Sequence, residues 1–368
     1  MTTLIIAEAG VNHNGSVEMA FKLVDAAVKA GVDIVKFQTF KSDLLASEDA
    51  EQAQYQVTNS GKKESQQAML KKLELSFDQH LAVKTYCQQQ GIEYLSTAFD
   101  FDSLDFLVKV MKLTKLKISS GEITNAPFIL AHALTGAELI VSTGMADLSE
   151  IEFALSVIAF GLIEQLKQNE NKQYTPLKPC AERFKQALTS QLGQQLLAEK
   201  VSLLHCTTEY PAPLAEVNLN AMDLMATTFS LPVGYSDHTE GLLVSLAAVA
   251  KGAHIIEKHF TLDRSLPGPD HQASIEPDEL TELVKNIRAI DLALGEKIKM
   301  ASPSEKTNIA VARKSIFAAR TIKQGEVITA DDIVVMRPGD GLSAAHYYDV
   351  IGNRAIRDFS IGESLVID

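Results

Sequence analysis

The sequence predicts a (β/α)8 barrel followed by a small β-rich domain, and three observations lead to this fold class. Short β-branched runs alternate with longer segments of helical period from the N-terminus to about residue 290. There are eight such runs, the number that closes a parallel barrel. After Gly295 the long helical pattern ends, and short strand-like runs with turn residues continue to the C-terminus.

The eight strands are expected in strict alternation with helices. Segments 17–30 and 242–250 carry the helical period most clearly, and Gly31, Gly91, Gly136 and Gly252 are placed to end a helix just before a strand. A doubly wound sheet is the alternative fold, but the chain has no glycine-rich dinucleotide fingerprint. The predicted strands are residues 4–8, 33–38, 93–97, 115–118, 138–142, 201–206, 232–235 and 254–257.

Two connections are longer than a barrel requires. Residues 43–80 follow the second strand and contain a helical segment at 64–75, and residues 161–200 precede the sixth strand as a solvated helical excursion. The predicted domains are a barrel at 1–295, a linker at 296–310 and a C-terminal domain at 311–368. That last domain contains a short internal repeat: residues 322–328 and 359–365 are each predicted to form a strand and a turn with Gly-Glu at the turn.

Composition limits the classes of partner. With 34 Lys and Arg against 47 Asp and Glu, the net charge is −13, which argues against nonspecific binding of nucleic acid or anionic membranes. Apolar runs fall short of the roughly 20 residues of a membrane span, and residues 1–3 do not resemble a secretory leader. Cys87, Cys180 and Cys206 lie far apart and are expected to be reduced, buried thiols. A cytoplasmic protein is therefore expected.

Every predicted strand ends in polar or ionisable residues. In a barrel the carboxyl ends of the strands form one mouth, where catalytic and binding residues gather. Eight polar strand ends around one mouth therefore predict an active site there. The groups are Glu8; Lys36 and Gln38; Ser96 and Thr97; Lys117, Ser119, Ser120 and Glu122; Ser142 and Thr143; His205, Thr207, Thr208, Glu209 and Tyr210; Ser236, Asp237 and His238; and Glu257, Lys258 and His259.

The residue types at this mouth indicate two kinds of ligand. Lys36 and Lys117 bring ammonium groups beside the hydroxyls of Ser120, Ser142 and Thr143, a set that suits a small ligand carrying phosphate and carboxylate. His238 and His259 end adjacent strands, and two neutral imidazoles near carboxylates suit a divalent ion with open positions acting as a Lewis acid. No cysteine accompanies them, which argues against a closed structural zinc site.

Several long motifs, in one order along nearly the whole chain, resemble the N-acetylneuraminate (sialic acid) synthase family, including its N,N'-diacetyllegionaminate synthases. The C-terminal segment resembles the antifreeze-like (SAF, β-clip) domain of that family, around 314–318, 325–326 and 337–339. The barrel motifs are 6–15 (IAEAGVNHNG), 35–39 (VKFQT), 117–122 (KISSGE), 204–211 (LHCTTEYP), 235–239 (YSDHT), 257–261 (EKHFT) and 268–270 (GPD).

The resemblance implies a condensation of phosphoenolpyruvate with an N-acetylated amino sugar to a nine-carbon 2-keto acid and phosphate, with C–O bond cleavage and a Mn²⁺ or Mg²⁺ ion. His238 and His259 would hold the metal, and Glu122 would be the acid or base of the water step. Glu8 and Asp270 would bind the open-chain sugar and belong with Glu122 to the catalytic set. Phosphoenolpyruvate would be held by Lys36, Lys117, Ser120, Ser142, Thr143, Tyr210 and Ser236.

The resemblance also implies a homodimer with exchanged C-terminal domains. Gln38 would lie beside the sugar, and Arg337 would reach the sugar site of the partner subunit. The amino sugar stays open between N-acetylmannosamine and the 2,4-diacetamido precursor of legionaminate. Two other functions remain as alternatives: another phosphoenolpyruvate-dependent condensing enzyme or aldolase on the same barrel, and an ice-binding module.

Overall fold

The computed structural model describes residues 2–54, 56–57 and 63–367. It divides into two compact units, Met1–Gly295 and Glu296–Asp368. Helix α14 (Pro303–Ala312) covers part of the predicted linker and belongs to the second unit. Each unit is described by itself below.

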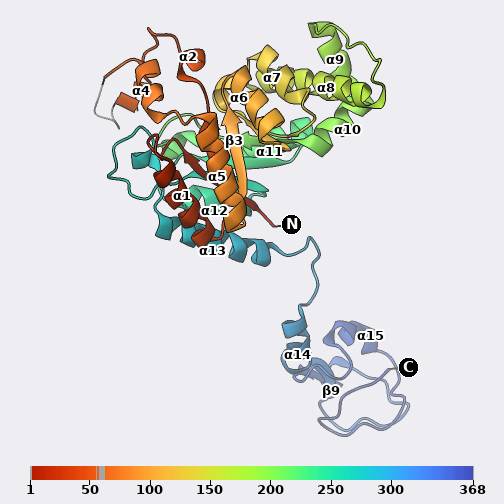
Figure 1. Ribbon diagram of the computed structural model, residues 1–368. Helices are drawn as coiled ribbons and strands as arrows, with labels where there is room; N and C mark the ends of the chain where they lie inside the picture. The colour runs from red at the N-terminus through yellow and green to blue at the C-terminus, as the bar shows by residue number, and fades with distance from the viewer. Residues whose placement is uncertain (1, 55, 58–62, 368) are drawn as a thin grey trace. The chain divides into compact units, whose positions relative to one another are not determined.

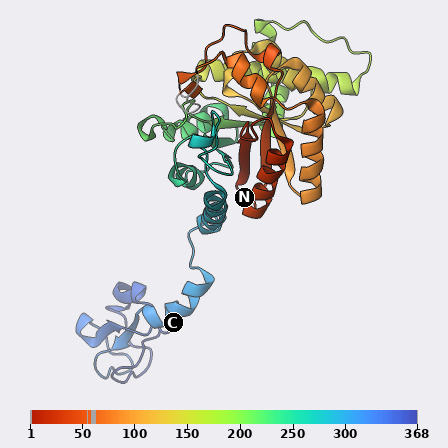
Figure 2. The ribbon, with the colours of Figure 1, turned by 60° about the vertical axis from the view of Figure 1, so that its left-hand side comes forward.

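The first unit is a closed parallel barrel in which each strand pairs with its neighbours in sequence order and β1 pairs with β8. This confirms the predicted barrel and excludes the doubly wound alternative, whose sheet has open edges. Figure 2 shows helices surrounding the strands. The strands are β1 (Leu4–Gly10), β2 (Ile34–Thr39), β3 (Glu93–Ala98), β4 (Lys115–Ile118), β5 (Glu138–Ser142), β6 (Val201–His205), β7 (Val233–Asp237) and β8 (Ile255–His259).

Helices fill the connections as the periodicity predicts. The four glycines expected to end helices all have positive φ, between 70° and 102°. The helices are α1 (Val17–Ala30), α2 (Ser42–Leu45), α4 (Gln66–Leu73), α5 (Phe77–Gln90), α6 (Phe101–Asp105) with a π-helical turn (Phe106–Val110), α7 (Ala126–Ala133), α8 (Leu148–Glu170), α9 (Ala181–Thr189), α10 (Gln191–Lys200), α11 (Asn220–Phe229), α12 (Leu243–Ala250) and α13 (Pro277–Leu294).

An aliphatic layer fills the inside of the barrel and sets the position of the polar mouth. It is made of one side chain from each of six strands, all of them at most 3% exposed. Because side chains alternate along a strand, the residue two positions further on points inward one layer higher. That next layer is polar, and it forms the floor of the cavity at the carboxyl ends of the strands. The aliphatic layer consists of Ile6, Ile34, Leu95, Ile140, Leu204 and Ile255.

In the described part of the connection after β2, the short helices α2 and α4 contact each other (Figure 1). The predicted helical segment at 64–75 is confirmed as α4, whose first turn is capped by the Ser65 hydroxyl accepting from the amide of Ala68. Tyr55 and residues 58–62 of this connection lie outside the described residues.

The connection before β6 differs from the prediction at its start. Helix α8 continues through Gly161 to Glu170, so the excursion begins about ten residues later than expected. A side chain at Gly161 would bring a Cβ within 2.5 Å of the Cβ of Ala133, so this glycine serves close packing of α8 on α7. Helices α9 and α10 pack on α8 and bury Phe184 and Leu197, so this segment is not wholly solvated.

The second unit is small and β-rich, as predicted. Strands β9 (Ser315–Ala318) and β10 (Ile333–Met336) pair antiparallel. The two copies of the internal repeat pair with each other, because Ile322 and Phe359 exchange both backbone hydrogen bonds at 2.9 Å. The Gly325 and Gly362 turns have φ of 80° and 77°. In each copy an arginine six residues before the glutamate forms an ion pair with it, Arg320 with Glu326 and Arg357 with Glu363. Helix α15 (Tyr347–Val350) completes the unit.

In the described part of the chain, no helix is both long enough and apolar enough to cross a bilayer. All three cysteines are free thiols. Cys87 and Cys206 are buried as expected, but Cys180 is exposed. The prediction is wrong for Cys180 because this residue lies in the extended segment before α9, outside the packed core.

The pKa of a buried histidine on α7 predicts how the free energy of unfolding depends on pH. The ring of His132 packs edge-on against Phe128, and its Nδ1 lies 2.9 Å from the Phe128 carbonyl oxygen. Burial lowers the pKa of His132 to about 4. Between pH 6.5 and 4 the unfolded imidazole therefore binds a proton that the folded one does not, so the free energy of unfolding falls as the pH falls.

We expect His132→Leu to flatten this dependence. At pH 4.5 the protonation of unfolded His132 costs the native protein about 2–3 kcal/mol relative to pH 7, from ~1.4 kcal/mol per pKa unit. Urea unfolding of wild type and variant at the two pH values measures the difference. Equal losses of stability in the two proteins would contradict the prediction.

Candidate active site

A cavity of about 310 Å³ opens at the carboxyl ends of the barrel strands. The strand-end residues that line it come from all eight strands or the turns that directly follow them. Within the barrel unit, every candidate site residue lines it except Glu122 and Thr143. Those that line it are Glu8, Lys36, Gln38, Lys117, Ser120, Ser142, Tyr210, Ser236, His238, His259 and Asp270.

Strand alternation decides which side chains reach the cavity. Ser236 and Glu257 lie one layer above the aliphatic filling and point inward. Asp237 and Lys258, their neighbours in sequence, point to the other side of the barrel wall, where Lys258 Nζ lies 2.9 Å from Asp237 Oδ2 in a fully buried ion pair. That pair belongs to the packing between strands and helices.

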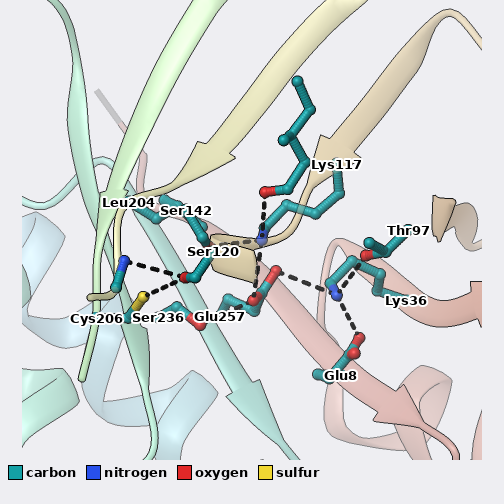
Figure 3. A network of polar contacts seen from close by, with 12 residues as sticks. Glu8, Lys36, Thr97, Lys117, Ser120, Ser142, Leu204, Cys206, Ser236 and Glu257 are labelled. Atoms are coloured by element: carbon teal, nitrogen blue, oxygen red, sulfur yellow. Dashed lines mark hydrogen bonds and ion pairs between the residues drawn. The ribbon is translucent and has the colours of Figure 1, made fainter. Parts of the chain in front are cut away.

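The floor of the cavity is a chain of alternating charges (Figure 3). Lys36 Nζ lies 2.8 Å from Glu8 Oε2 and 3.5 Å from Glu257 Oε2. Lys117 Nζ lies 3.8 Å from Glu257 Oε1 and donates to Ser142 Oγ at 2.6 Å. All four charged side chains are at most 5% exposed. We call Glu8, Lys36, Lys117 and Glu257 the charged floor.

The residues of the charged floor shift one another's pKa values. Burial alone would raise the pKa of Glu257, but Lys117 and Lys36 lower it to about 2. Burial raises the pKa of Glu8 to about 7, although Lys36 opposes the shift. The pKa of Lys36 is raised, because Glu257 and Glu8 outweigh its burial, and burial lowers the pKa of Lys117. The ionised Glu257 therefore lies between two lysines whose pKa values shift in opposite directions, and Glu8 is partly protonated at neutral pH.

Hydroxyl and backbone donors gather next to Lys117. Ser120 Oγ accepts from the amide of Gly144 at 3.0 Å and lies 3.2 Å from Cys206 Sγ. A Cβ at Gly144 would lie 2.3 Å from Thr208 Oγ1, so only glycine allows this close approach. Within the described chain, the buried hydroxyl of Thr208 has no hydrogen-bond partner. A cluster of small donors beside an ammonium suits the oxygens of a phosphoryl group.

The two histidines lie together at the ends of β7 and β8, with ring centres 5.6 Å apart. His238 Nδ1 lies 2.6 Å from the Thr207 carbonyl oxygen, which fixes the proton on Nδ1 and leaves the Nε2 lone pair toward the cavity. Buried Nδ1 of His259 has no hydrogen-bond partner among the described residues, and its nearest carboxylate oxygen is Asp270 Oδ2 at 4.0 Å. Tyr210 packs against both rings.

Both imidazoles are neutral at physiological pH. Burial lowers the pKa of His238 to about 4, and burial together with the neighbouring His238 lowers the pKa of His259 well below 6.5. His238 Nε2 has one long contact, to Ser236 Oγ at 3.4 Å, and His259 Nδ1 has no partner among the described residues. Neutral, oriented imidazoles of this kind fit a divalent cation. The described residues contain no group of three or more His, Cys, Asp or Glu placed to hold a metal, so a bound ion would complete its shell with substrate or water.

Two candidate residues of the barrel lie outside the cavity lining, and a third candidate belongs to the other unit. Glu122 sits in a short turn after β4, half-exposed, and its Oε2 accepts from Asn125 Nδ2 at 2.7 Å. The hydroxyl of Thr143 donates to the Leu204 carbonyl oxygen at 3.0 Å, so it is used within the barrel wall. Arg337 belongs to the C-terminal unit and donates to the Ala312 carbonyl oxygen at 3.1 Å.

The structure also gives roles to residues for which the sequence predicted a place at the mouth or in the core but no function. Glu257 is the centre of the charged floor, and it lies two positions before His259 on the same strand. Its place at the end of the eighth strand was predicted, but its pairing with both lysines was not. Thr97, which accepts from Lys36 Nζ at 3.2 Å, and Thr208 and Cys206 also line the cavity. An apolar wall from α2 and α4 could not be found from strand ends, because it comes from a distant connection.

Comparison with known proteins agrees with this architecture. A profile of the NeuB family matches residues 23–299, and one of the SAF domain matches residues 313–368. The N,N'-diacetyllegionaminic acid synthase of Campylobacter jejuni is 44% identical over 98% of both chains. That of Legionella pneumophila is 42% identical over 100% of this chain and 94% of its own.

A crystal structure of the N-acetylneuraminic acid (sialic acid) synthetase of Leptospira borgpetersenii, 31% identical, superposes with a TM-score of 0.65. It covers 84% of this chain and 90% of its own. The barrel, the order of its strand-end motifs and these matches lead to one conclusion: the chain belongs to the NeuB family and carries a C-terminal SAF domain.

Proposed function

We propose that this protein condenses phosphoenolpyruvate with an unphosphorylated N-acetylated amino sugar to give a nine-carbon 2-keto acid and phosphate. The main support for this proposal is that the charged floor lies beside the two neutral histidines in a barrel of the NeuB family. The relatives from C. jejuni and L. pneumophila support a sugar with two N-acetyl groups, because both are N,N'-diacetyllegionaminic acid synthases.

Phosphoenolpyruvate binds at the charged floor. Its phosphate lies against Lys117, Ser142 and the Ser120 hydroxyl, and its carboxylate lies toward Lys36 and Ser236. Charge-assisted hydrogen bonds from buried donors hold the anion and exclude water from it. Because Glu257 is ionised and shared by both lysines, it keeps the two ammonium groups charged and fixed before the substrate arrives.

His238 and His259 would hold a divalent cation, Mn²⁺ or Mg²⁺. When bound, the ion supplies Lewis-acid polarisation of the aldehyde oxygen of the open-chain sugar. The protein's own contribution is the orientation of the two imidazoles. The Thr207 carbonyl fixes the tautomer of His238, and burial keeps both rings neutral.

The sugar lies between the histidines and the side of the pocket formed by Glu8, Gln38 and Asp270. Gln38 Nε2 donates to Glu8 Oε1 at 3.2 Å, which links the sugar side to the charged floor. The π electrons of phosphoenolpyruvate form the bond from its C3 to C1 of the sugar, and the aldehyde oxygen takes up a proton to become a hydroxyl. Water then adds to the cationic C2 and loses a proton to a base. The resulting C2 hydroxyl loses its proton as the C2–O bond to phosphate breaks, which leaves a C2 ketone and inorganic phosphate. Burial raises the pKa of Glu8 to about 7 and that of Asp270 to about 6, so both exchange protons readily near neutral pH.

Glu122 is a weaker candidate for the water step than Glu8 or Asp270. It pairs with Asn125 outside the cavity lining, whereas the other two carboxyls line the cavity. A movement of the turn after β4 would have to bring Glu122 inward for it to act.

Release of inorganic phosphate tests the proposed reaction. The enzyme with Mn²⁺ and phosphoenolpyruvate is offered N-acetylmannosamine, a 2,4-diacetamido sugar, or a phosphorylated sugar without an N-acyl group. Phosphate release with an N-acetylated sugar only is expected. Release with the phosphorylated sugar alone would identify a different condensing enzyme of the same fold.

We further propose a cytoplasmic homodimer in which Arg337 serves the partner's sugar site. The guanidinium of Arg337 is exposed in the C-terminal unit, and its planar fork suits a carboxylate or an N-acyl group. Free thiols, including the exposed Cys180, support a reducing compartment.

Mixing two inactive variants tests the exchange. Arg337→Ala and His238→Ala chains together should recover up to about a quarter of wild-type activity, because half of random dimers are mixed and each has one complete site. Mixed dimers that form without recovering activity would show that Arg337 does not act across subunits.

A further inference from the structure

A loop of residues 262–274 lies between β8 and α13 and carries Asp270. Residues 263–265 in its outer part are exposed, whereas Pro269 and Asp270 in its inner part are buried and line the cavity. Its regular structure is one short 3₁₀ turn, His271–Ala273. The place of the Asp270 carboxyl therefore depends on what holds the loop to the rest of the barrel.

The turn after β1, residues 11–16, holds the inner part of this loop. Asn12 Nδ2 donates to the Phe260 carbonyl oxygen at 2.8 Å and to Ser274 Oγ at 2.9 Å. Ser274 Oγ in turn donates to the Asp270 carbonyl oxygen at 2.6 Å. Asn12 and Ser274 are at most 2% exposed, so these hydrogen bonds are shielded from water. One hydroxyl thus joins the Asn12 amide to the backbone of Asp270.

A second set of contacts holds the middle of the loop to the same turn. Asn14 Nδ2 donates to the Pro267 carbonyl oxygen at 2.9 Å. His271 Nε2 lies 3.2 Å from Asn14 Oδ1, and its Nδ1 lies 2.6 Å from Thr261 Oγ1. A Cβ at Gly268 would lie 2.6 Å from His271 Cδ2, so the loop passes this ring closely enough to require glycine.

These contacts determine the direction of each hydrogen bond. A carbonyl oxygen accepts, so Asn14 donates to Pro267 through Nδ2 and its Oδ1 is left to accept. His271 Nε2 therefore carries the proton, and Nδ1 accepts from the Thr261 hydroxyl. Burial lowers the pKa of His271 to about 4, so the ring is neutral at pH 7, as this arrangement requires. Each of these groups is then paired, which holds the loop in one position.

We propose that four residues outside the cavity lining position the Asp270 carboxyl by holding its loop to the turn after β1. We call them the loop latch: Asn12, Asn14, His271 and Ser274. Their hydrogen bonds hold the loop on both sides of Asp270, whose Oδ2 lies 4.0 Å from His259 Nδ1. This inference rests on the proposed function, in which Asp270 faces the sugar, and adds the residues that act through it.

Sugar kinetics with two variants of the full-length enzyme test the loop latch. Ser274→Ala removes the hydroxyl that holds the Asp270 carbonyl. Asn14→Gly removes the second set of contacts and keeps the turn, because glycine readily adopts its φ of 50°. At saturating phosphoenolpyruvate, each variant should lower kcat/KM for the N-acetylated sugar about tenfold, since a small displacement of Asp270 disturbs the aligned geometry. The KM for phosphoenolpyruvate should be unchanged, because Lys117 and Ser142 stand on β4 and β5.

Hydrogen exchange gives a readout that does not depend on the reaction. In the enzyme without substrates, the amides of residues 266–274 should exchange roughly three- to tenfold faster in both variants, because each loses hydrogen bonds that keep the loop in place. The amides of β4 should exchange at the wild-type rate. Mass spectrometry of peptides after timed labelling measures both segments.

Ser265→Ala is the matched control for Ser274→Ala. Ser265 lies in the exposed outer part of the same loop, and its Oγ donates to Asp263 Oδ1 at 2.6 Å, within the loop itself. This variant should leave the sugar kinetics and the exchange of residues 266–274 unchanged. Thermal unfolding shows which variants fold, and Asn14→Gly, at a half-buried position, carries the test if Ser274→Ala does not fold.

Three results would overturn the inference. Unchanged exchange of the loop in folded variants would show that these residues do not hold it. Faster exchange with unchanged sugar kinetics would show that they do not position Asp270 for the reaction. A KM for phosphoenolpyruvate raised as much as that for the sugar would indicate a general loss of structure. A wild type that forms no nine-carbon acid with any N-acetylated sugar would instead reject the proposed function, and hydrogen exchange would still decide whether the latch holds the loop.

Discussion

Replacing Lys117 by methionine is expected to lower kcat/KM for phosphoenolpyruvate by about a hundredfold. A charge-assisted contact is worth about 1.5–3 kcal/mol. The variant also leaves the ionised Glu257 facing the substrate anion with only one of its two compensating charges, that of Lys36. Steady-state kinetics with varied phosphoenolpyruvate at saturating sugar measure the effect.

Two comparisons make the Lys117 result specific. Lys115 lies two residues earlier on β4 and pairs with Glu93 at 3.0 Å near the surface, so Lys115→Met should have little effect. Lys36→Met should also cost at least about tenfold, because Lys36 is the second ammonium of the floor. If Lys117→Met changes only the KM for the sugar, phosphoenolpyruvate has been placed on the wrong side of the cavity.

Removing either histidine is expected to reduce turnover by about a thousandfold or more, the several kcal/mol that a Lewis-acid metal supplies. His238→Ala and His259→Ala should each lose tight Mn²⁺ binding by calorimetry while keeping the wild-type unfolding temperature within a few degrees. His346→Ala, an exposed histidine of the C-terminal unit, serves as the control. Full turnover by either variant after metal removal would contradict the role of these residues.

The pH dependence of metal binding gives an independent check. An ordinary histidine would begin to lose a metal below about pH 6.5. Burial lowers the pKa of His238 to about 4, so protons compete with the metal only near that value. Mn²⁺ affinity measured by calorimetry should therefore persist to about pH 5. A loss centred at pH 6.5 would show that the imidazoles are not shielded as described.

The barrel could be predicted because its signals are local. β-branched runs, helical periodicity and a glycine before each of several strands are properties of neighbouring residues, and the closed strand order follows from their number. The excursion before β6 was expected to start at residue 161, but Gly161 lies inside α8, which continues to Glu170. The glycine serves the contact of α8 with Ala133 of another helix, which only the tertiary structure reveals.

The candidate site, like the barrel, could be predicted in part from the sequence. Strand ends gave the ammonium groups, hydroxyls and histidines, because a barrel brings all strand ends to one mouth. Which of these side chains form ion pairs or hydrogen bonds with one another was not predictable. That Glu257 bridges Lys36 and Lys117, while Thr143 and Glu122 bond elsewhere, depends on side-chain directions. The apolar wall from α2 and α4 was missed because its contact with the mouth depends on how the connection after β2 folds back.

The fate of the bridging oxygen of phosphoenolpyruvate tests the central proposal most directly. Phosphoenolpyruvate labelled with ¹⁸O between C2 and phosphorus is incubated with the enzyme, Mn²⁺ and the diacetamido sugar, and both products are analysed by mass spectrometry. We predict a nine-carbon 2-keto acid without the label and an equal amount of inorganic phosphate that carries it, because the C2–O bond breaks. Label in the sugar acid, phosphate retained on the product, or no nine-carbon product would contradict the account.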